Sequence, residues 1–262
     1  MDGARTTPGG LYAHESGEGP LVVLVHGAMD RSGGMLRTRR LLQPGHRVVR
    51  YDRRGYGRSV TAPPGGGIDR QVQDLADVLD GRPAVVVGHS FGGVVALALA
   101  ERSPELVRAV AAYESPMTWE DEGAAVPLDD RAEENPDGVA EWFMRRMVGD
   151  DTWEKMPAGI RDDRRAEGRA LLADLRAIEP SGPPPYRAER VTVPVVAAHG
   201  EHARTRHRTA ALRLAERAPD AELVVVPGAD HGVHLSNPQA FADLALRALA
   251  RADARERSYG AG

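Results

Sequence analysis

Cysteine is absent from the 262 residues of the chain. Its absence excludes disulfide bonds, thiolate-bound metals and a cysteine nucleophile. Long apolar runs are missing as well. No stretch approaches the roughly 18 residues of a membrane-spanning helix, and the N-terminal residues contain no apolar core of a signal peptide. We therefore expect a cytoplasmic protein that does not associate with a membrane.

Neither sign of charge dominates the composition. The chain has 34 lysines and arginines against 38 aspartates and glutamates, for a formal net charge of −4. A nucleic-acid-binding surface requires a local excess of basic residues, so we expect no nucleic-acid partner. The length of 262 residues suits one large α/β domain that carries an insertion.

Short apolar runs alternate with helical patterns in the first part of the chain. Such runs are typical of strands that are buried on both faces of a sheet. The expected strands are 21–25, 47–51, 84–87 and 107–113, and the expected helices are 34–42, 68–80 and the stretch after residue 90. This alternation predicts a mostly parallel sheet with helices on both faces, preceded by a hairpin or edge strands within residues 1–20.

The alternation breaks between residues 116 and 190. This segment contains two helical patterns, at 139–147 and 171–178, and no convincing buried strand. Strands then follow at 193–198 and 222–226, with helices at 207–217 and from Pro238, and a charged tail from Arg251 that we expect to fray. We therefore expect an α/β core built from residues 1–115 and 191–262, with residues 116–190 forming a helical lid inserted after the sixth strand.

The chain is organised around the passage from the strand at 84–87 into the next helix. It reads Gly88-His89-Ser90-Phe91-Gly92, which matches the pattern G-x-S-x-G between a strand and a helix. So sharp a reversal forces Ser90 into a strained backbone conformation, and Gly88 and Gly92 remove side chains that would clash. The turn lifts the Ser90 hydroxyl to the N-terminus of the helix, where backbone N–H groups can stabilise an oxyanion. The pattern therefore indicates a nucleophilic serine.

Three further motifs follow other expected strands at the same edge of the sheet. They are His26-Gly27-Ala28, the stretch from Tyr51 to Ser59 (YDRRGYGRS) and Pro227-Gly228-Ala229-Asp230-His231. Together with the Ser90 motif, and in this order along the chain, they closely resemble the α/β-hydrolase superfamily. The resemblance implies the α/β-hydrolase fold and a serine esterase-like activity that needs no cofactor.

The same resemblance implies a nucleophile and a base. Ser90 would be the nucleophile, and His231 would be the base that takes its proton, because a free serine hydroxyl is a poor nucleophile. His234 lies three residues further on and is the weaker candidate for the base. We interpret it as a packing or helix-entry residue.

The oxyanion hole would be formed by backbone rather than side chains. The resemblance implies the N–H groups of Phe91 and of Ala28, with Met29 as a less favoured alternative to Ala28. We expect His26 and His89 to be structural, with His26 holding the oxyanion loop by hydrogen bonds.

The third member of the triad departs from the common pattern of the family. The usual position of the acid corresponds to Ala203, which cannot orient a histidine. Glu114, after the strand at 107–113, is favoured instead, because a lone glutamate between a buried strand and a Ser-Pro turn needs a reason to be there. Haloalkane dehalogenases, which belong to the same superfamily, place their acid at this point. Glu201, two residues before the usual position, remains the alternative acid.

The sequence thus predicts an enzyme that acts on a small, apolar, ester-like molecule. Ser90 would attack the carbonyl of a carboxylic ester, lactone or thioester and form an acyl-enzyme. A perhydrolase, a carbon–carbon bond hydrolase or an acyltransferase would use the same serine, and a non-catalytic binding protein of this fold stays open because of Ala203. We expect no metal site, since His199, His202 and His207 lack the spacing of a metal-binding motif.

Overall fold

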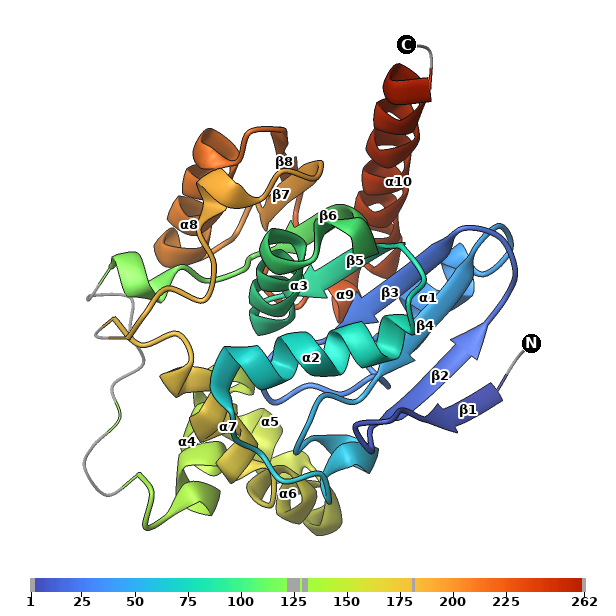
Figure 1. Cartoon of the computed structure of the whole chain (residues 1–262). Coiled ribbons are helices and arrows are strands. Elements are labelled where there is room, and N and C mark those ends of the chain that lie inside the picture. Colours follow the sequence, from blue (N-terminus) through green and yellow to red (C-terminus); the bar gives the residue numbers. More distant parts are fainter. Residues whose placement is uncertain (1–2, 122–127, 129–131, 181, 261–262) are drawn as a thin grey trace.

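The computed structural model describes residues 3–121, 128, 132–180 and 182–260. Eight strands form one sheet in the order β1-β2-β4-β3-β5-β6-β7-β8 (Figure 1). The strands are β1 (Gly3–Thr6), β2 (Tyr12–Ser16), β3 (Leu21–Val25), β4 (Arg47–Tyr51), β5 (Ala84–His89), β6 (Val107–Tyr113), β7 (Val195–Gly200) and β8 (Ala221–Val226). β1 pairs with β2, and β2 with β4, in the antiparallel direction. The pairs β4–β3, β3–β5, β5–β6, β6–β7 and β7–β8 are parallel. The predicted mostly parallel sheet, with its N-terminal hairpin, is confirmed.

Helices cover both faces of the sheet. α2 (Gly67–Leu79), α3 (Phe91–Arg102) and α8 (Thr205–Arg217) pack on one face, and α1 (Leu36–Leu42) and α10 (Pro238–Gly260) pack on the other. Alternate residues of one strand enter different cores: Val23 and Val86 join the first, whereas Val22 and Val85 join the second. This double burial is why the parallel strands read as uninterrupted apolar runs.

A group of four helices separates β6 from β7 along the chain, although the two strands are neighbours in the sheet. They are α4 (Pro136–Val148), α5 (Asp150–Lys155), α6 (Ala158–Arg165) and α7 (Gly168–Arg176), and they gather at one end of the molecule (Figure 1). These helices lie where the sequence predicts an insertion after the sixth strand, and α4 and α7 overlap the two helical patterns expected there. The sequence does not predict α5 and α6, because both are short, charged segments with few apolar residues. Residues 122–127, 129–131 and 181 of the insertion lie outside the described residues.

The prediction of a frayed tail from Arg251 is wrong. α10 continues as one helix to Gly260. Ion pairs hold the charged end of this helix to the sheet: Arg108 of β6 lies 2.7 Å from both Asp253 and Glu256. Neither α10 nor any other helix in the described part of the chain is apolar enough to cross a membrane.

Candidate active site

Ser90 lies at the turn between β5 and α3, in a strained backbone conformation. Its φ is 52° and its ψ is −124°, a region that residues other than glycine rarely adopt. Gly88 and Gly92 are required because other backbone segments approach them closely. A Cβ on Gly92 would lie 2.2 Å from the carbonyl oxygen of Val25, and a Cβ on Gly88 would lie 2.4 Å from Gly93. The turn therefore presents Ser90 at the start of α3, as the sequence pattern predicts.

The loop that follows β3 passes directly beside Ser90. A Cβ placed on Gly27 would lie 3.0 Å from Cβ of Ser90, so Ala28 is the next residue along a loop in contact with the serine. Met29 also has a positive φ, of 56°. Phe91 begins α3, and N–H groups in the first turn of a helix have no intrahelical acceptor. The predicted oxyanion residues thus both adjoin residues at the serine: Phe91 follows Ser90 in the chain, and Ala28 follows Gly27, which lies against it.

Glu114 follows β6 and contacts His231. Its Oε2 accepts a hydrogen bond from Nδ1 of His231 at 2.7 Å, and its Oε1 accepts one from the backbone N–H of Gly200 at 3.1 Å. The side chain is fully buried, and the backbone is strained, with a φ of 46°. Burial alone would raise the pKa of Glu114, but the hydrogen bonds from His207 and His231 outweigh burial and lower the pKa well below its usual value. Glu114 is therefore a carboxylate at neutral pH.

His207 is a second histidine on the same carboxylate, which sequence reasoning missed. Its Nδ1 donates to Oε2 of Glu114 at 2.8 Å, and its ring stacks on that of His231 with the centroids 4.4 Å apart. Burial lowers the pKa of His207 to about 4, although the hydrogen bond to Glu114 raises it. No motif marks this residue, because it lies in the first turn of α8 and meets Glu114 only through the packing of α8 against the sheet.

The other candidates lie elsewhere. Glu201 is exposed, and its Oε2 accepts from the N–H of Gly228 at 2.8 Å, so it caps a turn rather than orienting His231. Asp230 accepts from the N–H of Gly232 at 2.8 Å. Ala203, at the usual position of the acid, is buried in the turn after β7. Glu114 is thus the predicted acid that the structure brings to His231.

Several hydrogen bonds fix the loop that carries His231. The hydroxyl of Tyr113 donates to the carbonyl of Asp230 at 2.6 Å, and Nε2 of His89 donates to the carbonyl of His231 at 2.7 Å. Burial and the neighbouring His234 and His231 lower the pKa of His89 well below its usual value, so its ring is neutral at neutral pH. The predicted structural reading of His89 agrees with these contacts.

Arg53, in the loop after β4, joins the core to the helical insertion. Its guanidinium is fully buried and pairs with Asp174 of α7, with the closest atoms 2.6 Å apart. It also donates to the carbonyls of His26 and Gly27, at 2.9 and 3.1 Å. The ring of His26 is held between the N–H of Arg53 and the carbonyl of Gly27, both at 2.8 Å. The arginine therefore fastens the loop beside Ser90 to α7, and burial and the charge of Arg53 lower the pKa of His26 to about 4.

Comparison with known proteins agrees with this fold. A sequence model described as the alpha/beta hydrolase family matches residues 22–244. The chain is 27% identical to 2-(acetamidomethylene)succinate hydrolase of Mesorhizobium japonicum, over 87% of each chain. It is 30% identical to pimeloyl-[acyl-carrier protein] methyl ester esterase of Chromobacterium violaceum, over 92% of this chain and 96% of the relative. The crystal structure of an alpha/beta hydrolase from Sphaerobacter thermophilus superimposes with a TM-score of 0.73 at 25% identity, over 94% of this chain and all of that one.

The chain belongs to the alpha/beta hydrolase family. Its curated relatives are named hydrolases and esterases, and the chain is an enzyme of the hydrolase class.

Proposed function

We propose that the chain is a serine hydrolase whose triad is Ser90, His231 and Glu114. The observation that carries this proposal is the 2.7 Å hydrogen bond between Nδ1 of His231 and Oε2 of the buried, ionised Glu114. It supplies the acid that the sequence lacks at Ala203. The non-catalytic alternative rests on the missing acid at Ala203, and Glu114 would supply that acid.

The hydrogen bond sets the tautomer of the base. A carboxylate only accepts hydrogen bonds, so Nδ1 of His231 carries the proton and Nε2 of the neutral ring has a free lone pair. Nε2 takes the proton of the Ser90 hydroxyl as its oxygen attacks the carbonyl carbon of the substrate. Backbone N–H groups of Phe91 and Ala28 stabilise the oxyanion that forms.

The tetrahedral intermediate then collapses to an acyl-enzyme. His231 returns its proton to the leaving alcohol or thiol, and water, activated by the same histidine, releases the acid. The expected substrates are small carboxylic esters, lactones or thioesters. The name of the relative from Chromobacterium, a methyl ester esterase, supports this class.

Helices α4 to α7 would act as the lid over this substrate. Apolar side chains of α4, α5 and α7 pack with Met29, which belongs to the loop beside Ser90, in a cluster that includes Met144, Trp153 and Leu171. Arg164 of α6 also donates to the carbonyl of Met29 at 3.2 Å. An insertion in direct contact with the oxyanion loop is well placed to exclude water and to shape the binding site for an apolar group.

The direct test is covalent labelling with a fluorophosphonate, followed by measurement of the intact mass. We expect one adduct per chain on the wild type and none on Ser90→Ala. The hydrolysis of 4-nitrophenyl acetate should disappear in the same variant. A folded wild type that takes up no adduct, or an adduct that persists in Ser90→Ala, would overturn the proposal.

A further inference from the structure

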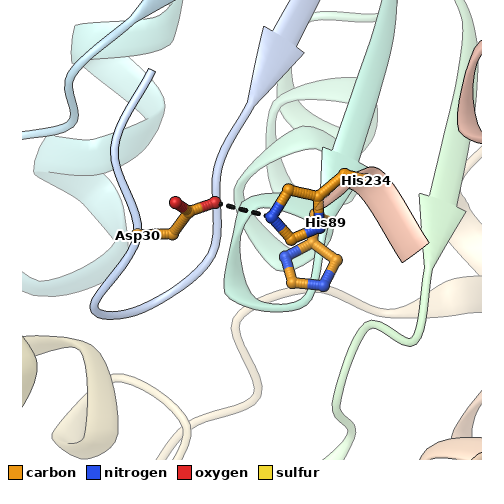
Figure 2. A group of neighbouring side chains, drawn as sticks. All are labelled: Asp30, His89 and His234. Carbon is orange, nitrogen blue, oxygen red and sulfur yellow. Dashed lines mark ion pairs between the residues drawn. The ribbon is translucent and has the colours of Figure 1, made fainter. Parts of the chain in front are cut away.

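A second group of ligand-type side chains lies next to His231 of the proposed triad, with the His89 and His231 ring centroids 4.7 Å apart. It consists of Asp30 from the loop after β3, His89 from the end of β5, and His234 from the short helix α9 (Val233–Ser236) (Figure 2). One ligand atom from each residue lies within 4.8 Å of the other two. The proposed mechanism assigns none of these atoms a role.

The polar atoms of this group are buried and lack hydrogen-bond partners. His89 and His234 are 5% and 3% exposed. Nδ1 of His89, both ring nitrogens of His234 and Oδ2 of Asp30 have no hydrogen-bond partner among the described residues. Nε2 of His234 lies 3.0 Å from Oδ2 of Asp30, the ion pair drawn in Figure 2, but the two atoms do not form a hydrogen bond. Buried polar atoms without partners are rare and require an explanation.

The hydrogen bonding of His89 leaves one nitrogen free to bind a cation. Its Nε2 donates to the carbonyl of His231, which can only accept, so this nitrogen carries the proton. The Nδ1 of the neutral ring then presents a bare lone pair toward Gly27. A Cβ on Gly27 would lie 3.0 Å from this atom, so the glycine keeps a side chain away from it. A histidine ligand whose other nitrogen donates to a carbonyl is the usual arrangement around a bound metal.

We propose that Asp30, His89 and His234 form a binding site for a divalent transition metal, with Zn²⁺ as the best fit. Two imidazoles and one carboxylate are the ligand set of three-residue zinc sites, whose fourth position is taken by water. Borderline-soft imidazole nitrogens also select against Mg²⁺ and Ca²⁺, which prefer oxygen ligands. The prediction from sequence of no metal site considered only His199, His202 and His207, which do not belong to this group.

The test measures the binding of Zn²⁺ alone, by calorimetry at pH 7.5, in the wild type and in two ligand variants. We expect one tight site in the wild type, and at least a hundredfold loss of affinity in Asp30→Asn and in His234→Gln. His207→Asn is the matched control, because it removes a ligand from the other group of convergent residues, Glu114, His207 and His231. This control should bind Zn²⁺ as the wild type does. The measurement of Zn²⁺ binding does not depend on hydrolysis, so Ser90→Ala should bind Zn²⁺ as the wild type does. A failure of the proposed triad would therefore leave the result on metal binding unaffected.

Absence of a tight site in the wild type would overturn the proposal. So would wild-type affinity in both ligand variants, or a loss of affinity confined to His207→Asn. Circular dichroism establishes that each variant is folded. Should the buried His234→Gln fail to fold, Asp30→Asn decides, because the Asp30 side chain is 19% exposed and the change preserves its shape. A zinc-edge anomalous difference map of soaked wild-type crystals then places the ion directly, and density at any position other than these three residues would contradict the assignment.

Discussion

Oε2 of Glu114 lies 2.7 Å from Nδ1 of His231, although the two residues are 117 positions apart in the chain. The same oxygen also accepts from His207 at 2.8 Å. One buried carboxylate oxygen of Glu114 therefore orients the proposed base, His231, and His207 holds the same oxygen in place.

Glu114→Gln should reduce kcat by up to about ten-thousandfold, the loss associated with removing the orienting acid of a triad. The amide can present a donor to His231, which favours the tautomer that cannot accept the Ser90 proton. The measurement is steady-state hydrolysis of 4-nitrophenyl acetate, with a melting curve to establish folding. Glu201→Gln is the matched control and should retain activity. Near-normal turnover in Glu114→Gln together with a large loss in Glu201→Gln would transfer the role to Glu201.

His207→Leu should lower kcat by roughly tenfold with little change in KM, a factor that corresponds to about 1.4 kcal/mol of lost hydrogen bonding to a charged group. His207 acts through Glu114, so it is a positioning residue. His207→Asn keeps an N–H donor near the carboxylate and should restore most of kcat. If leucine and asparagine reduce kcat equally, or if KM alone changes, the hydrogen bond to Glu114 is not what matters.

The stability of the protein should fall as the pH drops from about 6.5 toward 4.5. Burial lowers the pKa of His26 and of His207 to about 4, from an unperturbed value of 6.5. In this pH window the unfolded chain takes up a proton at each histidine and the folded chain does not, so protonation favours unfolding. Each residue accounts for up to about 3 kcal/mol of that loss. Urea unfolding at several pH values measures the slope, and His207→Asn should make it shallower. An unchanged slope in the variant would contradict the assignment.

The buried pair of Arg53 and Asp174 should be strongly coupled. Arg53→Met leaves an uncompensated carboxylate in the interior, which costs about 3–5 kcal/mol of unfolding free energy. Asp174→Leu should be similarly destabilising, whereas the double variant should lose less than the sum of the two, because neither charge is left alone. Arg247→Met is the control: its ion pair with Glu222 is largely exposed and should contribute about 0–1 kcal/mol. If the losses of unfolding free energy in the two single variants simply add in the double variant, the contact between Arg53 and Asp174 does not stabilise the attachment of α7 to the core.

Gly92→Ala should destabilise the protein by about 3 kcal/mol or more, because the new methyl would lie 2.2 Å from the carbonyl oxygen of Val25. Gly33→Ala is the matched control, since a Cβ there meets nothing within 4 Å. Chemical denaturation of both variants measures the difference. Equal stability of the two would mean that the close approach of α3 to β3 is not a constraint.

The sequence by itself determined the order of the elements and much of the proposed site. Continuous apolar runs such as 21–25 and 84–87 predict strands buried on both faces, because only such strands need to be apolar at every position. The pattern around Ser90 predicts its strained turn, because Gly88 and Gly92 are needed where backbone segments nearly touch. The sequence does not predict α5, α6 or the helical end of α10. Ion pairs with residues of other elements stabilise these segments, and local sequence patterns do not reveal such pairs.

Only the tertiary structure decided which distant side chains meet. Glu114 and Glu201 both follow sheet strands and are hard to separate by sequence, but the register of β6 and β7 brings Glu114 to His231 and turns Glu201 to the N–H of Gly228. No local motif marks His207, Asp30 or His234, and the motif that contains His89 does not indicate a ligand role for it. A hydrogen bond or a metal ligand set depends on distances of a few ångströms between segments far apart in the chain. Packing of the whole sheet and its helices fixes those distances, and no short stretch of sequence encodes them.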